Sequence, residues 1–268
     1  MTDTKIEIRN LYKVFGNNPE AAMKHVHAGI SKQDLLDHHG HVLGLRDINV
    51  KIKSKRIQVI MGLSGSGKST LIRHINRLIE PTEGEVIVDR DNVLAMSIEE
   101  LRDFRRHKAS MVFQRFGLLP HRTVSQNVAY GLSIQGISEG EASERSQRWI
   151  DRVGLAGFEQ HFPAQLSGGM QQRVGLARAL ATDAEILLMD EAFSALDPLI
   201  RTDMQNILLD LQEELHKTIV FITHDLDEAL RIGDEISILR DGEVIPVSYT
   251  HLRAHETEAD LVCRLLLE

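Results

Sequence analysis

The sequence predicts an α/β protein built on a parallel sheet. Strand-like and helix-like segments alternate along most of the chain, which is the pattern of strand–helix–strand units. Two short apolar segments, 186–189 and 219–223, are typical of strands buried on both faces of a parallel sheet, and each precedes a helical pattern. A glycine-rich segment at 62–70 joins a third apolar strand to a helix.

The individual elements follow from the periodicity of apolar residues. Alternating apolar and polar residues over 5–15 predict a half-buried strand, and near-helical spacing over 20–39 predicts a helical insertion within 17–41. Over 123–160 the spacing is again helical, interrupted by glycines, which predicts a helical insertion in the α/β core. Further strands are expected over 42–52, 57–61, 85–88, 186–189 and 219–223, and further helices over 69–78, 98–106 and 171–181; residues 111–113 are apolar and short.

Composition excludes several classes of protein. The apolar and charged shares of the 268 residues, 42% and 26%, are those of globular proteins, so a disordered or fibrous chain does not fit. The net charge of −8 argues against a nucleic-acid partner bound through its phosphates. A single cysteine, Cys263, excludes a disulfide framework. Because the polar start lacks a signal core and no apolar run approaches about 20 residues, we expect a soluble cytoplasmic protein that reaches a membrane only through a partner.

The segment 62–70 has the composition of a P-loop. Glycines let the backbone curl so that successive N–H groups face phosphate oxygens, and the following helix adds the positive end of its dipole. Lys68 is expected to reach the β- and γ-phosphates, and Ser69 to bind Mg²⁺. The expected nucleotide-binding residues of this loop are Gly62, Ser64, Gly65, Ser66, Gly67, Lys68, Ser69 and Thr70.

Two further segments complete a candidate site. The apolar run 186–189 ends in Asp190 and Glu191, which places a Mg²⁺ ligand and a residue able to orient or deprotonate water at the rim of a sheet. Ser167, Gly168 and Gly169 precede a helix that includes Gln171, and so form a second anion-binding helix start. Because one nucleotide needs only one P-loop, this second helix start could serve a nucleotide bound on another copy of the chain.

Together these segments resemble the nucleotide-binding subunit of an ATP-binding cassette (ABC) transporter over residues 5–245. The resemblance implies a P-loop NTPase core of ABC-ATPase type, with an antiparallel β subdomain and a helical subdomain at about 115–175. It also implies a homodimer in which the signature Ser167, Gly168, Gly169 and Gln171 of one subunit covers ATP on its partner.

The resemblance also assigns roles to single residues. Phe15 resembles the aromatic residue that stacks on adenine, and Gln114 the glutamine that joins Mg²⁺ and water to the transmembrane contact. Asp197, in the segment 194–197, resembles the residue at the dimer seam, and His224 the histidine that contacts the γ-phosphate. ATP and Mg²⁺ are the implied cofactors, with Ser69, Gln114 and Asp190 at the metal and Glu191, His224 and Lys68 as catalytic residues.

Four segments are most similar to importers of glycine betaine, proline and related quaternary amines: 17–41, 76–82, 171–181 and 191–201. This branch implies integral-membrane permease subunits as partners, a substrate-binding protein as an indirect partner, no nucleic acid, and a peripheral location at the cytoplasmic face of the inner (plasma) membrane. Importers of methionine, polar amino acids or phosphonate are the nearest alternatives. A non-transport ABC ATPase fits less well, because the chain has one P-loop and no long coiled-coil insertion.

Some features depart from the family pattern. Residues 54–56 and 89–91 carry charged residues where a glycine is common, which we interpret as two hairpin-type turns of altered geometry. From Pro246 the resemblance ends, and residues 246–268 are interpreted as a tail that is not native to the domain; the alternative is a genuine amphipathic tail in which Leu261, Leu265 and Leu266 share a helix face. Five histidines in 17–41, namely His25, His27, His38, His39 and His41, are interpreted as a polar helix face rather than a metal site, since their spacing does not place pairs on one face.

Overall fold

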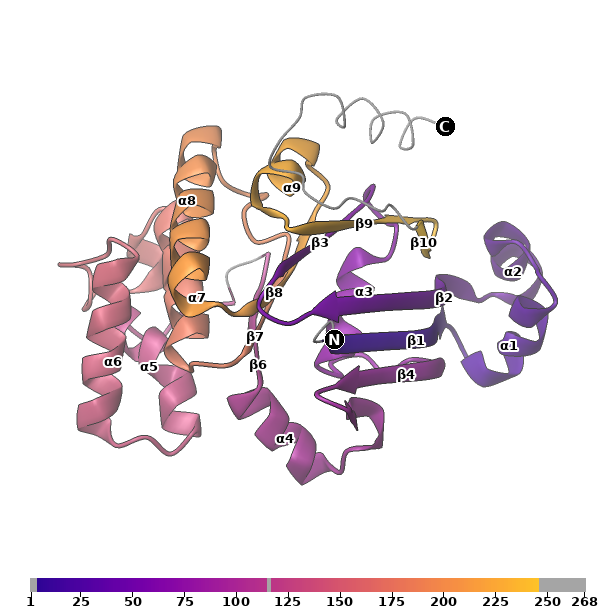
Figure 1. Ribbon diagram of the computed structural model, residues 1–268, viewed down its shortest axis with the longest axis horizontal. Coiled ribbons are helices and arrows are strands. Elements are labelled where there is room, and N and C mark those ends of the chain that lie inside the picture. The colour runs from indigo at the N-terminus through magenta and orange to yellow at the C-terminus, as the bar shows by residue number, and fades with distance from the viewer. Residues whose placement is uncertain (1–3, 115–116, 246–268) are drawn as a thin grey trace. The chain divides into compact units, whose positions relative to one another are not determined.

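The computed structural model describes residues 4–114 and 117–245, and the predicted tail 246–268 lies outside them. The chain divides into two compact units, one formed by residues up to Ser97 together with those from Thr223 onward, the other by Ile98–Ile222 (Figure 1). Strands and helices alternate in both units, and parallel strand pairs occur in both, which confirms the predicted α/β class.

The first unit contains the antiparallel sheet that the family resemblance implies. Its strands β1 (Thr4–Phe15), β2 (Val42–Lys53), β4 (Glu83–Val88) and β5 (Asp91–Asn92) lie in the order β2-β1-β4-β5. All neighbouring pairs are antiparallel, and Phe15 at the end of β1 pairs with Val42 at the start of β2. The insertion between these two residues therefore begins and ends at one edge of the ladder.

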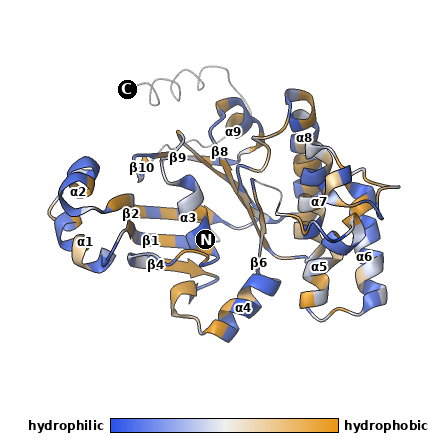
Figure 2. Ribbon diagram, turned by 180° about the vertical axis from the view of Figure 1, so that it is seen from behind, coloured by the Kyte–Doolittle hydropathy of each residue, from blue (hydrophilic) through white to orange (hydrophobic). Residues whose placement is uncertain are grey.

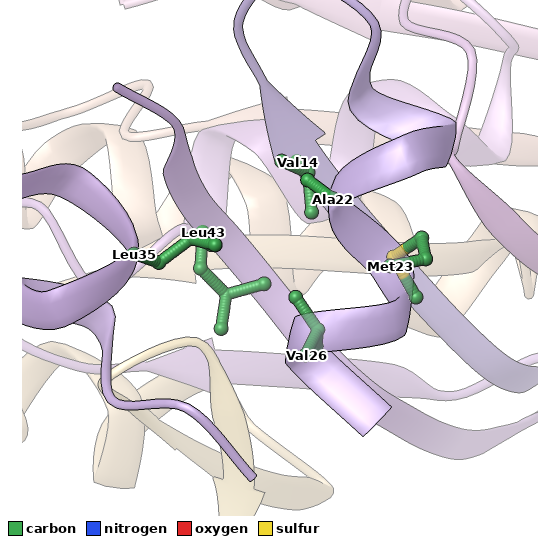
Figure 3. Close-up of a cluster of buried hydrophobic side chains, with 6 residues drawn as sticks. All are labelled: Val14, Ala22, Met23, Val26, Leu35 and Leu43. Atoms are coloured by element: carbon green, nitrogen blue, oxygen red, sulfur yellow. The ribbon is translucent and has the colours of Figure 1, made fainter. Parts of the chain in front are cut away.

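The insertion is helical, as predicted, but it forms two helices. α1 (Pro19–His27) and α2 (Lys32–His39) are separated at Gly29, whose φ of +84° is left-handed, and Ser31 then caps α2 by accepting a hydrogen bond from the backbone of Asp34. Both helices pack their apolar faces onto β1 and β2 at one end of the sheet (Figures 1 and 3). The buried cluster consists of Val14, Ala22, Met23, Val26, Leu35 and Leu43.

A second group of strands in the first unit supports the P-loop. β3 (Ile57–Met61) pairs in parallel with β9 (Glu235–Arg240), and β10 (Glu243–Ile245) pairs antiparallel with β9. The short 3₁₀ turn Val93–Ala95 and helices α3 (Lys68–Ile75) and α9 (Leu226–Ile232) complete this unit. α3 ends earlier than the predicted residue 78, because Arg77 adopts a left-handed φ of +52°.

The second unit is a three-stranded parallel ladder with helices. β6 (Ala109–Val112), β7 (Ile186–Asp190) and β8 (Thr218–Thr223) pair in that order, which assigns the short apolar segment near 111 to a strand. Its helices are α4 (Ile98–His107), α5 (Val124–Ile134), α6 (Glu139–Arg152), α7 (Gly168–Ala181) and α8 (Pro198–Leu215), with a 3₁₀ turn at Pro163–Gln165. Helices α5, α6 and α7 pack side by side, and α6 carries mainly hydrophilic residues (Figure 2). None of the helices in the described residues has the length and apolar character needed to cross a membrane.

The two departures from the family pattern differ in structure. The 89–91 segment is a tight β4–β5 hairpin in which Asp89 and Arg90 have φ of +50° and +78°, as a type I′ turn requires. An arginine in this conformation costs roughly 1–2 kcal/mol relative to glycine. The prediction for 54–56 was wrong: β2 pairs with β1 whereas β3 pairs with β9, so this left-handed turn at Lys55 joins strands that do not form a hairpin.

Helix α3 contains a fully buried imidazole that gives stability a pH dependence. The Nδ1–H of His74 donates to the carbonyl of Thr70 at 2.6 Å, so Nε2 is the unprotonated nitrogen, and it is buried without a partner. Burial lowers the pKa of His74 to about 4. The unfolded chain therefore binds a proton below about pH 6.5 that the folded chain refuses until about pH 4, and stability is lost as the pH falls through this window.

We expect His74 to remove about 2 kcal/mol of stability between pH 7 and pH 5. Urea unfolding at pH 7 and pH 5 measures the free energy of unfolding of the wild type and of His74→Leu. The decrease between the two pH values should be smaller in His74→Leu by this amount. His38→Leu is the matched control because the His38 ring is largely exposed. An equal change in the free energy of unfolding in the wild type and His74→Leu would show that His74 does not cause the pH dependence.

Candidate functional site

The P-loop follows the fully buried strand β3 and ends at the start of α3. Gly65 and Gly67 have left-handed φ of +80° and +105°, which only glycine adopts without strain, and Gly67 is the N-terminal cap residue of α3. The Lys68 side chain is buried and folds back over the loop, where Nζ donates to the carbonyls of Gly62 at 2.8 Å and Leu63 at 2.9 Å. The loop therefore wraps an ammonium group, which an anion at this loop would face.

Close backbone approaches hold the loop in shape. A Cβ on Gly62 would lie 2.1 Å from the carbonyl oxygen of Leu239 in β9, and one on Gly67 would lie 2.8 Å from the carbonyl oxygen of Gly44 in β2. The backbone N–H of Gly242 donates to the carbonyl of Ser66 at 3.1 Å. Packing therefore requires glycine at both positions, and at Gly67 the left-handed conformation requires it as well, so these contacts hold the loop in shape.

Phe15 lies at the edge of the first unit, at the end of β1, and is 39% exposed. Its ring lies against the backbone of Gly44, where an added Cβ would be 2.8 Å from Cε2, and Lys13 Nζ lies 5.0 Å from the ring centroid. A partly exposed aromatic face fixed to a sheet is suited to stacking on a planar ring.

The two predicted carboxylates occupy the end of β7. Asp190 is buried, and Glu191, the next residue, has a left-handed φ of +47°, which turns the chain sharply at the strand end. Gln114 Nε2 donates to Glu191 Oε2 at 3.1 Å and lies 3.5 Å from Ser194 Oγ, which itself donates to the carbonyl of Glu191 at 2.9 Å. The structure thus brings together Gln114 and Glu191, which are 77 residues apart in the sequence.

The second predicted helix start has the expected form. Ser167 caps α7 by accepting from the backbone N–H of Met170 at 3.3 Å, and Gly168 is exposed at the first position of the helix. A Cβ on Gly169 would lie 2.6 Å from Cγ2 of Ile200, so this glycine permits close packing on α8. The start of α7, at Ser167 and Gly168, is exposed.

Asp197 and His224 both occupy junctions before helices. Asp197 caps α8 by accepting from the backbone of Ile200 at 3.1 Å. His224 is exposed immediately after β8, between two anchored neighbours: Thr223 Oγ1 donates to Glu228 Oε2 at 2.5 Å, and Asp225 caps α9. The backbone of His224 is therefore held at the strand end while its ring faces outward.

Sequence reasoning missed three contributors to these sites. Gly44 makes room for the Phe15 ring, Lys13 lies over that ring, and Ser194 contacts both Gln114 and Glu191. A glycine inside the strand pattern of 42–52 is a recognisable signal of a close approach. The other two contacts join residues whose proximity depends on strand register and turn geometry, and no local pattern indicates them.

The donor groups fit a phosphate ligand and Mg²⁺. Ser66 Oγ is buried in the loop without a hydrogen-bond partner, and a phosphate oxygen would supply one. Mg²⁺ at P-loop sites takes few protein ligands, because phosphates and waters complete its octahedron. A buried carboxylate at Asp190 and a hydroxyl at Ser69 have the required oxygen chemistry. Among the described residues no three His, Cys, Asp or Glu side chains gather as ligands of a metal bound by protein alone.

The fold and these segments define a P-loop protein, and comparison with known proteins specifies the family. Residues 45–194 match the family described as ABC transporter. The glycine betaine/proline betaine transport system ATP-binding protein ProV of Escherichia coli is 54% identical over 243 residues, or 91% of this chain and 61% of that protein. The trimethylamine N-oxide transport system ATP-binding protein TmoW of Ruegeria pomeroyi is 50% identical over 89% of this chain and 70% of its own length.

A solved structure agrees with the sequence relatives. The ATP-binding cassette MJ0796, described as a dimer in a post-hydrolysis state bound to ADP and Pi, aligns with a TM-score of 0.78 and 34% identity over 93% of this chain and 100% of its own. The chain belongs to the ABC transporter family, as the sequence motifs indicated. It spans 61% of the length of ProV.

Proposed function

We propose that this chain is the ATP-hydrolysing subunit of an importer for a small osmoprotectant of the quaternary amine class, such as glycine betaine or proline betaine. The observation that carries the proposal is the similarity to ProV, 54% identity over 243 residues. The glycine betaine transport ATP-binding protein OpuAA of Bacillus subtilis is similar to the same extent, 53% over 243 residues. The methionine import ATP-binding protein MetN of Staphylococcus haemolyticus matches a shorter part, 47% over 204 residues, so methionine import is the second candidate.

In the proposed mechanism ATP binds with its phosphates in the P-loop and adenine on Phe15. Lys68 exchanges the carbonyls of Gly62 and Leu63 for phosphate oxygens, and Ser66 gains the partner that its buried hydroxyl lacks. Ser69, Asp190 and Gln114 would hold Mg²⁺, which would supply the positive charge that neutralises the phosphates.

Glu191 would orient or deprotonate the attacking water, since its carboxylate is already fixed by Gln114. His224 would contact the γ-phosphate from its anchored position after β8. The exposed start of α7, with Ser167, Gly168, Gly169 and Gln171, would cover the ATP of a second copy, and Asp197 would lie at the seam. ATP then has higher affinity for the closed dimer than for the open one, which is what can drive a transport cycle.

The implied partners are a second copy of the chain, integral-membrane permease subunits and, indirectly, a substrate-binding protein, with the chain peripheral at the cytoplasmic face of the plasma membrane. The test is purification of the tagged chain from membranes with its permease, reconstitution into vesicles and uptake of radiolabelled glycine betaine and methionine. We expect ATP-dependent uptake of glycine betaine only. Uptake of methionine alone would select the second candidate, and a co-purifying nucleic-acid or ribosomal partner would contradict the transport proposal.

A further inference from the structure

His41 closes the base of the α1–α2 insertion. Its Nδ1 lies 2.6 Å from the carbonyl oxygen of His39 at the end of α2, and its Nε2 lies 2.6 Å from the carbonyl oxygen of Asn17, the second residue after Phe15. The ring therefore joins the last turn of the insertion to its first residues. The insertion is also held to the sheet by the packing of α1 and α2 and by two hydrogen bonds, one between His27 and Glu83 and one from Arg46 to the carbonyl of Ile30.

The chemistry of the two partners defines the protonation state of the ring. Both are backbone carbonyl oxygens, which only accept hydrogen bonds, so both ring nitrogens must donate. A neutral imidazole has one N–H and one lone pair and would place that lone pair against a carbonyl oxygen. Only an imidazolium can therefore make both hydrogen bonds at once, and charge-assisted hydrogen bonds of this kind are stronger than neutral ones.

The backbone around His41 leaves space for its ring. A Cβ on Gly16 would lie 2.6 Å from Cδ2 of His41, so the glycine that follows Phe15 makes the space that the ring fills. The backbone of His41 is fixed as well, because its N–H donates to the carbonyl of Leu35 in the C-terminal turn of α2.

The connection to the adenine-stacking face is short. Phe15 pairs with Val42, the residue after His41, and its ring rests on Gly44 of the same strand. The His41–Asn17 bond thus ties the two strands together at the pair that presents the ring. Loss of this bond loosens the end of β1, which then depends on the Phe15–Val42 pair and on the bond from Val14 to Thr82. Molecules with a displaced Phe15 lower the apparent affinity for adenine nucleotides in proportion to their fraction.

We propose that protonated His41 is a positioning residue for Phe15, and that ATP affinity is therefore higher when this imidazole is charged; the proposal rests on the proposed function of Phe15 as the adenine-stacking residue. The charged or titratable groups that act on His25, in α1, are His39 from α2, Lys24 from α1 and His41 itself. His25 stacks on His39 with ring centroids 4.0 Å apart, and its pKa is lowered by burial and then by His39, Lys24 and His41.

The direction of the pH dependence follows from the bonds. The two hydrogen bonds of His41 to His39 and Asn17, here called the clasp, form together only while both ring nitrogens carry a proton. The advantage in ATP affinity over a chain that lacks the clasp therefore falls as the pH rises.

The experiment measures the dissociation constant of MgATP by calorimetric titration at pH 6 and pH 8, for the wild type, His41→Ala and His41→Gln. Taking the ratio of variant to wild type at each pH cancels the titration of ATP itself. We expect His41→Ala to bind on the order of five-fold more weakly than the wild type at pH 6, and this ratio to be smaller at pH 8. In His41→Gln one amide NH₂ can donate to both carbonyls at any pH, so this variant should bind tightly at both.

Three controls separate positioning from general damage. His38→Ala removes an exposed imidazole from the same helix end and should match the wild type at both pH values. Magnesium tripolyphosphate, which lacks adenine, should bind wild type and His41→Ala equally. In a Phe15→Ala background His41→Ala should cause no further loss of MgATP affinity, because the ring that His41 positions is gone.

Equal MgATP affinities of the wild type and His41→Ala at pH 6, or an equal loss of tripolyphosphate affinity, would overturn the proposal while leaving the proposed ATPase function intact. Wild-type chain that binds no MgATP at either pH would overturn the proposed function, and this proposal with it.

Discussion

Replacing Glu191 by glutamine is expected to slow ATP hydrolysis by about 10²–10⁴-fold while leaving ATP binding intact. The expectation follows from the geometry at the end of β7, where Gln114 Nε2 donates to Glu191 Oε2 at 3.1 Å. A glutamine at position 191 can still accept this bond through its amide oxygen, so the local structure is retained. What is lost is the negative charge that orients water or receives its proton.

The measurement is the rate of phosphate release under saturating MgATP, together with gel filtration in its presence. Since hydrolysis opens the ATP-bound dimer in the proposed cycle, Glu191→Gln should accumulate as a dimer with ATP bound. Glu185→Gln is the matched control, because Glu185 immediately precedes β7 as Glu191 immediately follows it, and its partner is Lys108 at 3.0 Å. Hydrolysis by Glu191→Gln at the wild-type rate would show that another group activates the water.

The same strand shows which parts of the fold are predictable from sequence. β7 and β8 are short, apolar and followed by helices, and this local pattern is sufficient to predict parallel buried strands. The two-helix form of the insertion was not predicted because apolar spacing continues across the break, although Gly29 and the capping Ser31 mark it. The parallel pairing of β3 with β9 joins segments about 180 residues apart, and no local pattern determines such a partner.

The residues of the candidate site also differ in whether the sequence predicts them. Residues within continuous motifs, such as those of the P-loop, were predicted because backbone conformation and chemistry are local there: Gly67 requires its left-handed φ whatever the rest of the fold does. Contacts made by strand register were not predicted. The Phe15 ring on Gly44 and the His41 bond to Asn17 exist because β1 and β2 pair in one register, which places the ends of a long insertion together.

Mixing two inactive variants is expected to restore ATPase activity if the start of α7 acts on the nucleotide of a partner subunit. Lys68→Ala removes the ammonium from the P-loop, and Ser167→Arg removes the cap of α7 and places a bulky side chain at its exposed start. A heterodimer of the two has one site built from an intact P-loop and an intact signature, and one site damaged twice. If the subunits exchange freely and the two sites hydrolyse independently, an equal mixture should recover about a quarter of wild-type activity.

A second mixture tests the same arrangement in the opposite direction, again for sites that hydrolyse independently. The chain with both substitutions, mixed equally with wild type, forms heterodimers without any intact site if the signature acts in trans, so activity per wild-type chain should fall to about half. If each P-loop instead used its own signature, wild-type subunits would keep full activity in the mixture and the single variants would gain nothing from each other. Melting temperatures of all variants are needed alongside, since loss of the Ser167 cap alone costs roughly 1 kcal/mol. Unchanged wild-type activity on addition of the doubly substituted chain would exclude a shared site, and a fall to half would place Ser167 on the nucleotide of the neighbouring subunit.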